Sequence, residues 1–265
     1  MIKSPLRYPG GKSKSMNIIS KFFPESFKEY REPFLGGGSP LIYILQNYMP
    51  EKVLANDLYF ELFQFWNHVK NDLDNLINKI VEFRAQYPIG KELYNFAKAQ
   101  IVASNDNLEI AALFFLLNRI TFSGISESGG YSQESFEKRF TLSSIHRVME
   151  VAPLLNSVEI HYDDYKDILD IPGKDVFIFC DPPYRLAKGL YGRAGAMHHT
   201  FDHERFASDM KNCSHKWCIT YDDSPETRAL FSFASIEPWN VVYGMRNSGT
   251  TNKQQSTEIV IRNYV

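Results

Sequence analysis

The chain has 265 residues, of which 44% are hydrophobic, and a formal net charge of −2. This length suffices for one large domain, or for a domain that carries a smaller inserted one. The charge argues against a protein that coats nucleic acid without sequence preference, because phosphate neutralisation dominates such binding. The first residues lack a secretory apolar segment, and the longest apolar run, residues 110–117, is too short for a membrane span. We therefore expect a cytoplasmic protein that does not enter membranes.

Short apolar runs, each followed by polar or glycine-rich residues, predict the buried strands of a Rossmann-like α/β sheet. In chain order these runs are residues 30–34, 53–55, 158–162, 176–180 and 217–220. Ligands bind at the carboxyl ends of strands in such sheets, so the residues that follow each run are candidates for a site. The last apolar stretch, residues 258–262, alternates as an edge strand does.

Between these strands, the middle of the chain has a mostly helical pattern. Its strongest apolar helix covers residues 109–120, with a plausible N-terminal cap in residues 104–106. Residues 121–133 are polar and contain three glycines, which predicts a loop or hairpin. We predict a catalytic domain of residues 1–60 and 156–265. A helical domain of residues 61–155, with the hairpin near residues 119–135, is inserted into it.

A glycine-rich turn, Gly36-Gly37-Gly38, follows the first predicted strand and precedes a helix-like run. Glycines there let the backbone approach a ligand closely, although a tight turn without a ligand is the alternative. Asp57 ends the next strand, 21 residues after Gly36, a separation that suits a carboxylate accepting both hydroxyls of a ribose. Leu41 occupies the last glycine position of the dinucleotide fingerprint, which disfavours NAD and favours S-adenosylmethionine.

A second glycine pair precedes Lys12 and superficially suggests a P-loop. The full motif requires a glycine where this chain has Leu6, so we expect no nucleoside triphosphate site. The alternative is that Lys12 provides a cation near a carboxylate, such as the methionine tail of the cofactor.

The most specific signal is Asp181-Pro182-Pro183-Tyr184, directly after the strand at 176–180. Two prolines stiffen the loop and leave its carbonyls free as acceptors. The Asp181 carboxylate and the Pro182 carbonyl can grip the N–H bonds of an exocyclic amine, whose lone pair is otherwise delocalised into the ring. Tyr184 offers a flat face for a base, and such stacking is worth roughly 1–3 kcal/mol. The motif predicts methylation of a base amine, for which the base must leave the duplex. A rigid turn with a strand-capping aspartate is the alternative.

These segments together resemble the Dam-type, α-group DNA adenine-N6 methyltransferases. The matching segments, in the order typical of that group, are Arg7-Tyr8-Pro9-Gly10-Gly11-Lys12, Glu32-Pro33-Phe34-Leu35-Gly36-Gly37-Gly38-Ser39, Asn56-Asp57 and Asp181-Pro182-Pro183-Tyr184. The resemblance implies methyl transfer from S-adenosyl-L-methionine to a flipped-out adenine of double-stranded DNA at a short defined sequence, without a metal. S-adenosyl-L-homocysteine would be the second product. It also implies a cofactor site lined by Tyr8, Lys12, Phe34, Gly36, Gly38, Asp57, Tyr165 and Asp181.

The resemblance extends to the start of a DNA-reading hairpin, where we expect Arg119, Ser123 and Ser126 to meet DNA. The stretch from Ile125 to Tyr131 departs from members that read GATC. It has no arginine for the bidentate guanine contact that most often reads the major groove, so GATC specificity is not favoured. Basic residues elsewhere are further candidates for DNA contacts, namely Arg185, Lys188 and Arg246.

Two alternatives to adenine methylation stay open at this point. A DNA cytosine-N4 methyltransferase performs the same amine chemistry but more often has serine in place of Asp181. A catalytically silent DNA-binding module of the same fold would show a decayed tetrapeptide, whereas this one is intact. A cognate restriction endonuclease is not deducible from the sequence.

The histidines near residue 200 could suggest a metal site, because His199 and His203 share an i,i+4 spacing. Asp202, directly before His203, is a typical N-cap residue. We therefore expect a capped helix start here and no metal.

Overall fold

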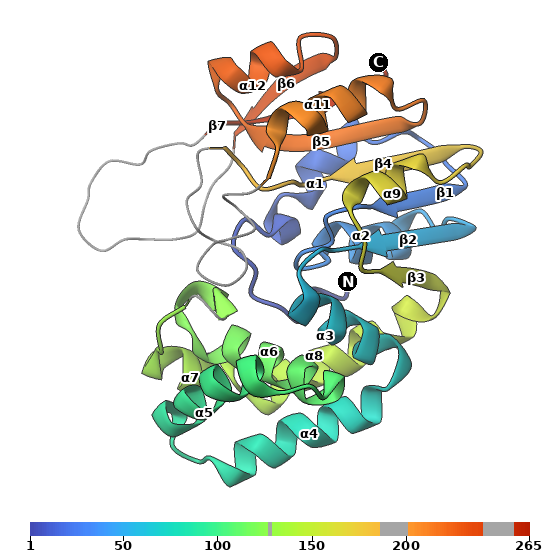
Figure 1. The fold of residues 1–265 in the computed structure, drawn as a ribbon. Coiled ribbons are helices and arrows are strands. Elements are labelled where there is room, and N and C mark those ends of the chain that lie inside the picture. The colour runs from blue at the N-terminus through green and yellow to red at the C-terminus, as the bar shows by residue number, and fades with distance from the viewer. Residues whose placement is uncertain (127–128, 186–200, 241–256) are drawn as a thin grey trace.

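The computed structural model describes residues 1–126, 129–185, 201–240 and 257–265. Within them, seven strands form one sheet in the order β3-β2-β1-β4-β5-β7-β6 (Figure 1). The strands are β1 Glu29–Glu32, β2 Lys52–Asn56, β3 Val158–His161, β4 Val176–Cys180, β5 Lys216–Asp222, β6 Ser235–Asn240 and β7 Thr257–Arg262. Neighbours among β1 to β5 pair in parallel, and β7 runs antiparallel to both β5 and β6. The predicted α/β fold is confirmed.

The prediction that the final strand lies at the edge is wrong. β7 lies between β5 and β6, and its residues Ile259, Val260 and Ile261 are fully buried on both faces of the sheet. The edge strand on this side of the sheet is β6, which contains Pro238. Proline cannot donate a hydrogen bond to a neighbouring strand, and it is found mainly in edge strands. The low apolar content of residues 235–240 explains why their pattern predicted no strand.

Helices cover both faces of the sheet, and β4 shows how its residues divide between them. Phe177 and Phe179 share a core with α1 Met16–Ile19 and α2 Ser39–Asn47. Ile178 and Cys180 point to the opposite face, where they pack with α9 Tyr165–Asp170 and α11 His203–Asn212. This alternation is the period of two that a strand imposes. The sheet is therefore the middle layer of three.

The helical part of the chain surrounds one central helix, α6 Asn107–Ile120. Every residue of α6 from Ile110 onward is buried, as expected for a helix that is apolar all round. The Asp106 side chain caps it by accepting from the backbone N–H groups of Leu108 and Glu109 at 2.9 and 3.4 Å, which confirms the predicted helix and its cap. The remaining helices are α3 Phe60–Asn71, α4 Leu73–Gln86, α5 Gly90–Ala103, α7 Gln133–Arg139, α8 Leu142–Val151 and α12 Pro225–Leu230, with short 3-10 turns at η1 Lys12–Lys14, η2 Ser20–Phe22, η3 Phe122–Gly124 and η5 Ala152–Ser157.

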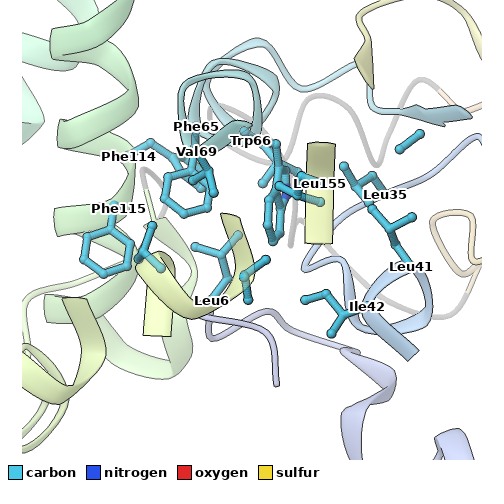
Figure 2. Close-up of a cluster of buried hydrophobic side chains, with 14 of the residues drawn as sticks. Leu6, Leu35, Leu41, Ile42, Phe65, Trp66, Val69, Phe114, Phe115 and Leu155 are labelled. Atoms are coloured by element: carbon cyan, nitrogen blue, oxygen red, sulfur yellow. The ribbon is translucent and has the colours of Figure 1, made fainter. Parts of the chain in front are cut away.

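The helical part and the sheet share one continuous hydrophobic core. Figure 2 shows Phe65 and Trp66 of α3 between Phe114 of α6 and Leu35, which follows β1. The rings of Phe65 and Phe115 stack with centroids 5.7 Å apart. The division into a catalytic domain and an inserted domain of residues 61–155 stays a prediction. None of the helices in the described ranges has both the length and the apolar character that a bilayer crossing requires.

Candidate active site

The loops that follow β1, β2 and β4 meet at the carboxyl edge of the sheet. β1 lies between β2 and β4 in the sheet. From β1 the chain continues to β2 on one side, and it later returns to form β4 on the other side. Such a reversal of strand order opens a crevice where ligands bind in α/β sheets. A cleft lies there, with a volume of about 1160 Å³ out to its open mouth. Among the residues that line it are all eight that the sequence predicts for the cofactor, namely Tyr8, Lys12, Phe34, Gly36, Gly38, Asp57, Tyr165 and Asp181.

The glycine turn after β1 forms part of this cleft. Gly36 and Gly38 have φ angles of 47° and 67°, a region that favours glycine. A Cβ atom on Gly36 would lie 2.9 Å from the Tyr8 ring, and one on Gly38 would lie 2.8 Å from the Trp66 ring. Trp66 Nε1 also donates to the Gly36 carbonyl at 3.0 Å, so α3 holds the turn in place. The glycines are required by the packing of the turn itself as well as by any ligand.

Asp57, at the end of β2, ties the strand to the glycine turn. Its Oδ2 accepts from the Gly36 N–H at 2.8 Å, and its Oδ1 accepts from the Tyr59 N–H at 2.9 Å. Burial raises the pKa of Asp57 to about 6, and the two backbone hydrogen bonds oppose this rise. Each carboxylate oxygen can accept a second hydrogen bond, so Asp57 fits the two hydroxyls of a ribose.

Aromatic side chains form another part of the cleft. The rings of Phe34 and Tyr165 stack with centroids 5.5 Å apart, and the Tyr165 hydroxyl donates to Asp209 at 2.8 Å. The Arg205 guanidinium lies 5.1 Å from the centre of the Tyr165 ring and donates to both oxygens of Asp164 at 2.9 and 3.1 Å. Flat apolar surfaces of this kind suit a purine ring. Arg205 carries no motif that would have marked it in the sequence.

Asp181 is held by three side chains at the end of β4. Lys12 Nζ lies 2.8 Å from each of its carboxylate oxygens and also donates to the Gly10 carbonyl at 2.8 Å. The Thr220 hydroxyl donates to Asp181 Oδ1 at 2.7 Å, and the Tyr184 hydroxyl lies 3.2 Å from the same oxygen. Lys12 therefore lies beside a carboxylate, as expected of it, but that carboxylate belongs to Asp181.

Tyr184 packs against residues of β5 and β7. Its ring stacks on Tyr221 of β5, with centroids 5.7 Å apart and planes 14° apart. Its hydroxyl lies 3.0 Å from Glu258 Oε2 at the start of β7. Asp181 and Pro183 line the cleft, and Pro182 is buried behind them.

Two residues of this cluster, Thr220 and Glu258, were not predicted as site residues from the sequence. Thr220 lies within a predicted strand, and Glu258 opens the last one, so neither belongs to a motif. Glu258 pairs with Asp222 across the antiparallel ladder between β5 and β7. Because this ladder brings the start of β7 beside the end of β5, only the sheet order places Glu258 near Asp181.

The expected DNA-contact residues that the structure describes differ in their exposure. Arg119 is 3% exposed, and its guanidinium donates to the Arg139 carbonyl at 2.8 and 2.6 Å and to the Pro5 carbonyl at 3.1 Å. Ser126 is buried too, so these two side chains are not placed to touch DNA. Arg119 lies inside the protein because the Pro5 and Arg139 carbonyls need hydrogen-bond donors, which its guanidinium provides.

The other expected contacts lie in different settings. Ser123 is half-buried in η3, within the turn that the bridge between Thr121 and Tyr131 closes. Arg185 is exposed, and its backbone N–H donates to Asp222 at 2.8 Å. Lys188 and Arg246 lie outside the described residues.

The expected helix start near residue 202 is confirmed. The Asp202 side chain accepts from the N–H groups of Glu204 and Arg205 at 3.1 and 2.9 Å, at the first turn of α11. A ring nitrogen of His203 contacts the Tyr221 hydroxyl. His199 lies outside the described residues.

Comparisons with known proteins show the family to which the chain belongs. Residues 8–245 match the family of D12 class N6 adenine-specific DNA methyltransferases. The chain is 27% identical over 201 residues to the Type II methyltransferase M.MjaIII of Methanocaldococcus jannaschii, across 69% of this chain and 70% of that protein. It is 28% identical over 185 residues to the DNA adenine methylase of Haemophilus influenzae, across 68% of this chain but only 63% of that protein. It is 21% identical over 275 residues to the Type II methyltransferase M.CviBI of Paramecium bursaria Chlorella virus NC1A, across 99% of this chain and all of that protein. The predicted resemblance is confirmed, and the chain belongs to the D12 class N6 adenine-specific DNA methyltransferase family.

Proposed function

We propose that this protein binds S-adenosyl-L-methionine in the cleft between β1, β2 and β4 and methylates N6 of an adenine extruded from double-stranded DNA. The observation that carries the proposal is the convergence of three kinds of group in that cleft. They are the carboxylate of Asp57, the stacked rings of Phe34 and Tyr165, and the Asp181 carboxylate at the head of the tetrapeptide.

The chemistry of the cleft fits the cofactor part by part. Asp57 would accept the ribose hydroxyls, and Phe34 and Tyr165 would pack against the cofactor's adenine. Lys12 would pair with the carboxylate of the methionine tail, since a buried ammonium needs an anionic partner. Gly36 and Gly38 let the backbone approach closely, and Tyr8 packs against this turn. S-adenosyl-L-methionine supplies an electrophilic methyl group when it is bound.

The protein's own contribution to the reaction is to hold the base amine and shape its hydrogen bonds. Asp181 and the Pro182 carbonyl would accept the two N–H groups of adenine N6, which draws the nitrogen lone pair out of the ring. Fixed acceptors of this kind act without reorganising during the reaction. Lys12 now occupies both oxygens of Asp181, so the amine takes over a site that Lys12 vacates. Tyr184 would support the base beside Asp181.

We further propose that the helical domain of residues 61–155 reads a short DNA sequence through the turn between residues 119 and 135. The position of that turn in the fold supports this proposal. The Gly124 backbone lies so close to Arg7 that a Cβ atom there would be 2.2 Å from the Arg7 carbonyl. This contact ties the turn to the segment that carries Lys12. A cytoplasmic enzyme acting on DNA agrees with the absence of a membrane-spanning helix in the described residues.

The decisive experiment replaces Asp181 with alanine and measures methyl transfer to unmethylated duplex DNA. We expect Asp181→Ala to abolish transfer, and full activity would refute the mechanism. Asp170→Ala is the matched control, because Asp170 is exposed at the end of α9 and pairs with Lys166. Digestion of the wild-type product to nucleosides should give N6-methyladenine. N4-methylcytosine would refute the base assignment, and no methylated base would favour the silent binding module.

A further inference from the structure

The Tyr184 hydroxyl lies between two carboxyl groups that belong to different strands of the sheet, Asp181 after β4 and Glu258 in β7. It is 3.2 Å from Asp181 Oδ1 and 3.0 Å from Glu258 Oε2. Both distances are those of hydrogen bonds, or close to them. A phenol has a single hydrogen and can donate it to one acceptor at a time. The protonation states of these groups therefore decide which carboxyl group accepts the Tyr184 hydrogen.

With the Asp181 carboxylate as an acceptor, two arrangements of hydrogens satisfy this trio. When Glu258 is protonated, it donates to the Tyr184 oxygen and Tyr184 donates to Asp181, so both contacts are hydrogen bonds. When Glu258 is ionised, the Tyr184 hydrogen is shared between two carboxylates, and the closer one is Glu258. The hydroxyl then turns toward Glu258, and Asp181 Oδ1 loses one of its donors.

The setting of Glu258 makes both states accessible. It is 2% exposed, and among the described residues the titratable or charged groups that act on it include Lys12 of η1, Asp181 after β4, Asp222 of β5 and Tyr184. Burial raises the pKa of Glu258 to about 7, Lys12 opposes this rise, and the negative charge of Asp181 adds to it. The carboxyl thus changes its charge near neutral pH.

We propose that Glu258 is a positioning residue that sets the direction of the Tyr184 hydroxyl and thereby the number of acceptor sites that Asp181 offers to the base amine. The inference rests on the proposed role of Asp181. Asp181 Oδ1 already accepts from Thr220 at 2.7 Å. A second donation from Tyr184 fills that oxygen, whereas a hydroxyl turned to Glu258 leaves a site open for the amine. Methyl transfer is therefore faster when Glu258 is ionised.

The test is the pH profile of single-turnover methyl transfer to unmethylated plasmid DNA at saturating S-adenosyl-L-methionine. Saturation keeps the titration of Asp57 out of the rate. For the wild type we expect the rate to rise at least tenfold between pH 6 and 8. The pKa of Glu258 is about 7, and it rises further when Lys12, which lowers it, turns to the cofactor. Glu258→Gln keeps the size of the side chain and cannot titrate, so its profile should be flat over this range.

Two further variants make the result decisive. Tyr184→Phe removes the hydroxyl that carries the effect and should also give a flat profile. Glu237→Gln, in the neighbouring strand β6, should keep the wild-type rise because Glu237 pairs with Arg262 instead. If Glu258→Gln does not fold, Tyr184→Phe alone decides.

A tenfold rise that persists in a folded Glu258→Gln or Tyr184→Phe variant overturns the inference. That result leaves the proposed function intact. A wild-type protein that makes no N6-methyladenine at any pH would instead remove the proposed function, so the two failures are distinguishable.

Discussion

The ammonium group of Lys12 lies 2.8 Å from each carboxylate oxygen of Asp181, although 169 residues separate the two in the sequence. Lys12 is 4% exposed, and its ammonium also lies 5.0 Å from the centre of the Tyr184 ring. These are the contacts that the amine of a target base would make with Asp181 and Tyr184. In the proposed mechanism the ammonium therefore occupies the place of the substrate amine, and loading of the cleft would redirect it.

This geometry gives a first prediction about the cofactor. Replacing Lys12 with methionine should weaken S-adenosyl-L-methionine binding by about 10- to 100-fold, because a hydrogen bond to a charged group contributes about 1.5–3 kcal/mol. Isothermal titration calorimetry measures the affinity. Lys14→Met is the matched control, since Lys14 is exposed on the same short turn. Equal affinities of the two variants would show that Lys12 does not hold the cofactor.

The second prediction concerns the pH dependence of cofactor binding. The pKa of Asp57 is raised to about 6 in the folded protein, and the ribose hydroxyls need the ionised carboxylate as acceptor. The affinity should therefore increase about tenfold from pH 5 to pH 7, in step with the ionised fraction. In Asp57→Asn the affinity should be lower and independent of pH in this window. Titrations at several pH values test this, and a pH-dependent Asp57→Asn variant would contradict it.

The same pKa fixes the sign of the effect of Asp57 on stability. Burial disfavours the ionised form, so the folded pKa lies above the ordinary value of 3.8. The contribution of Asp57 to folding is fully present below that value and is lost as the pH rises toward about 6. Asp57 should thus lower the stability of the ligand-free protein between about pH 4 and 6, a range that overlaps the one in which its affinity for the cofactor increases.

The third prediction concerns Arg119. Replacing it with methionine removes the donors to the buried Pro5 carbonyl and the partly buried Arg139 carbonyl, and should lower the free energy of unfolding by about 1–3 kcal/mol. Denaturant unfolding measures this change. Arg139→Met, an exposed arginine on α7, should change stability little. If Arg119→Met instead kept its stability and weakened only DNA binding, the structural role of Arg119 would be disproved.

Several features of the protein follow from the sequence alone because their causes are local. The cap at Asp106 and the helix after it need only a short polar side chain and an unbroken apolar run. Asp57 and Asp181 each end a buried strand, and strands of a parallel sheet bring such ends to one edge. The cleft that joins the glycine turn, Asp57 and Asp181 could therefore be predicted before its geometry was known.

Other features were decided by the tertiary structure. The alternation of β7 is the same for an edge strand and an inner one, and only its pairing with both β5 and β6 buries it. That pairing brings Glu258 to Tyr184, which no spacing in the sequence indicates. Arg119 is likewise a charged residue of a kind that usually meets solvent or DNA, yet hydrogen bonds to the Pro5 and Arg139 carbonyls hold its guanidinium inside the protein. Sequence patterns report the period of a segment and the chemistry at its ends, whereas contacts between distant segments depend on how the whole core packs.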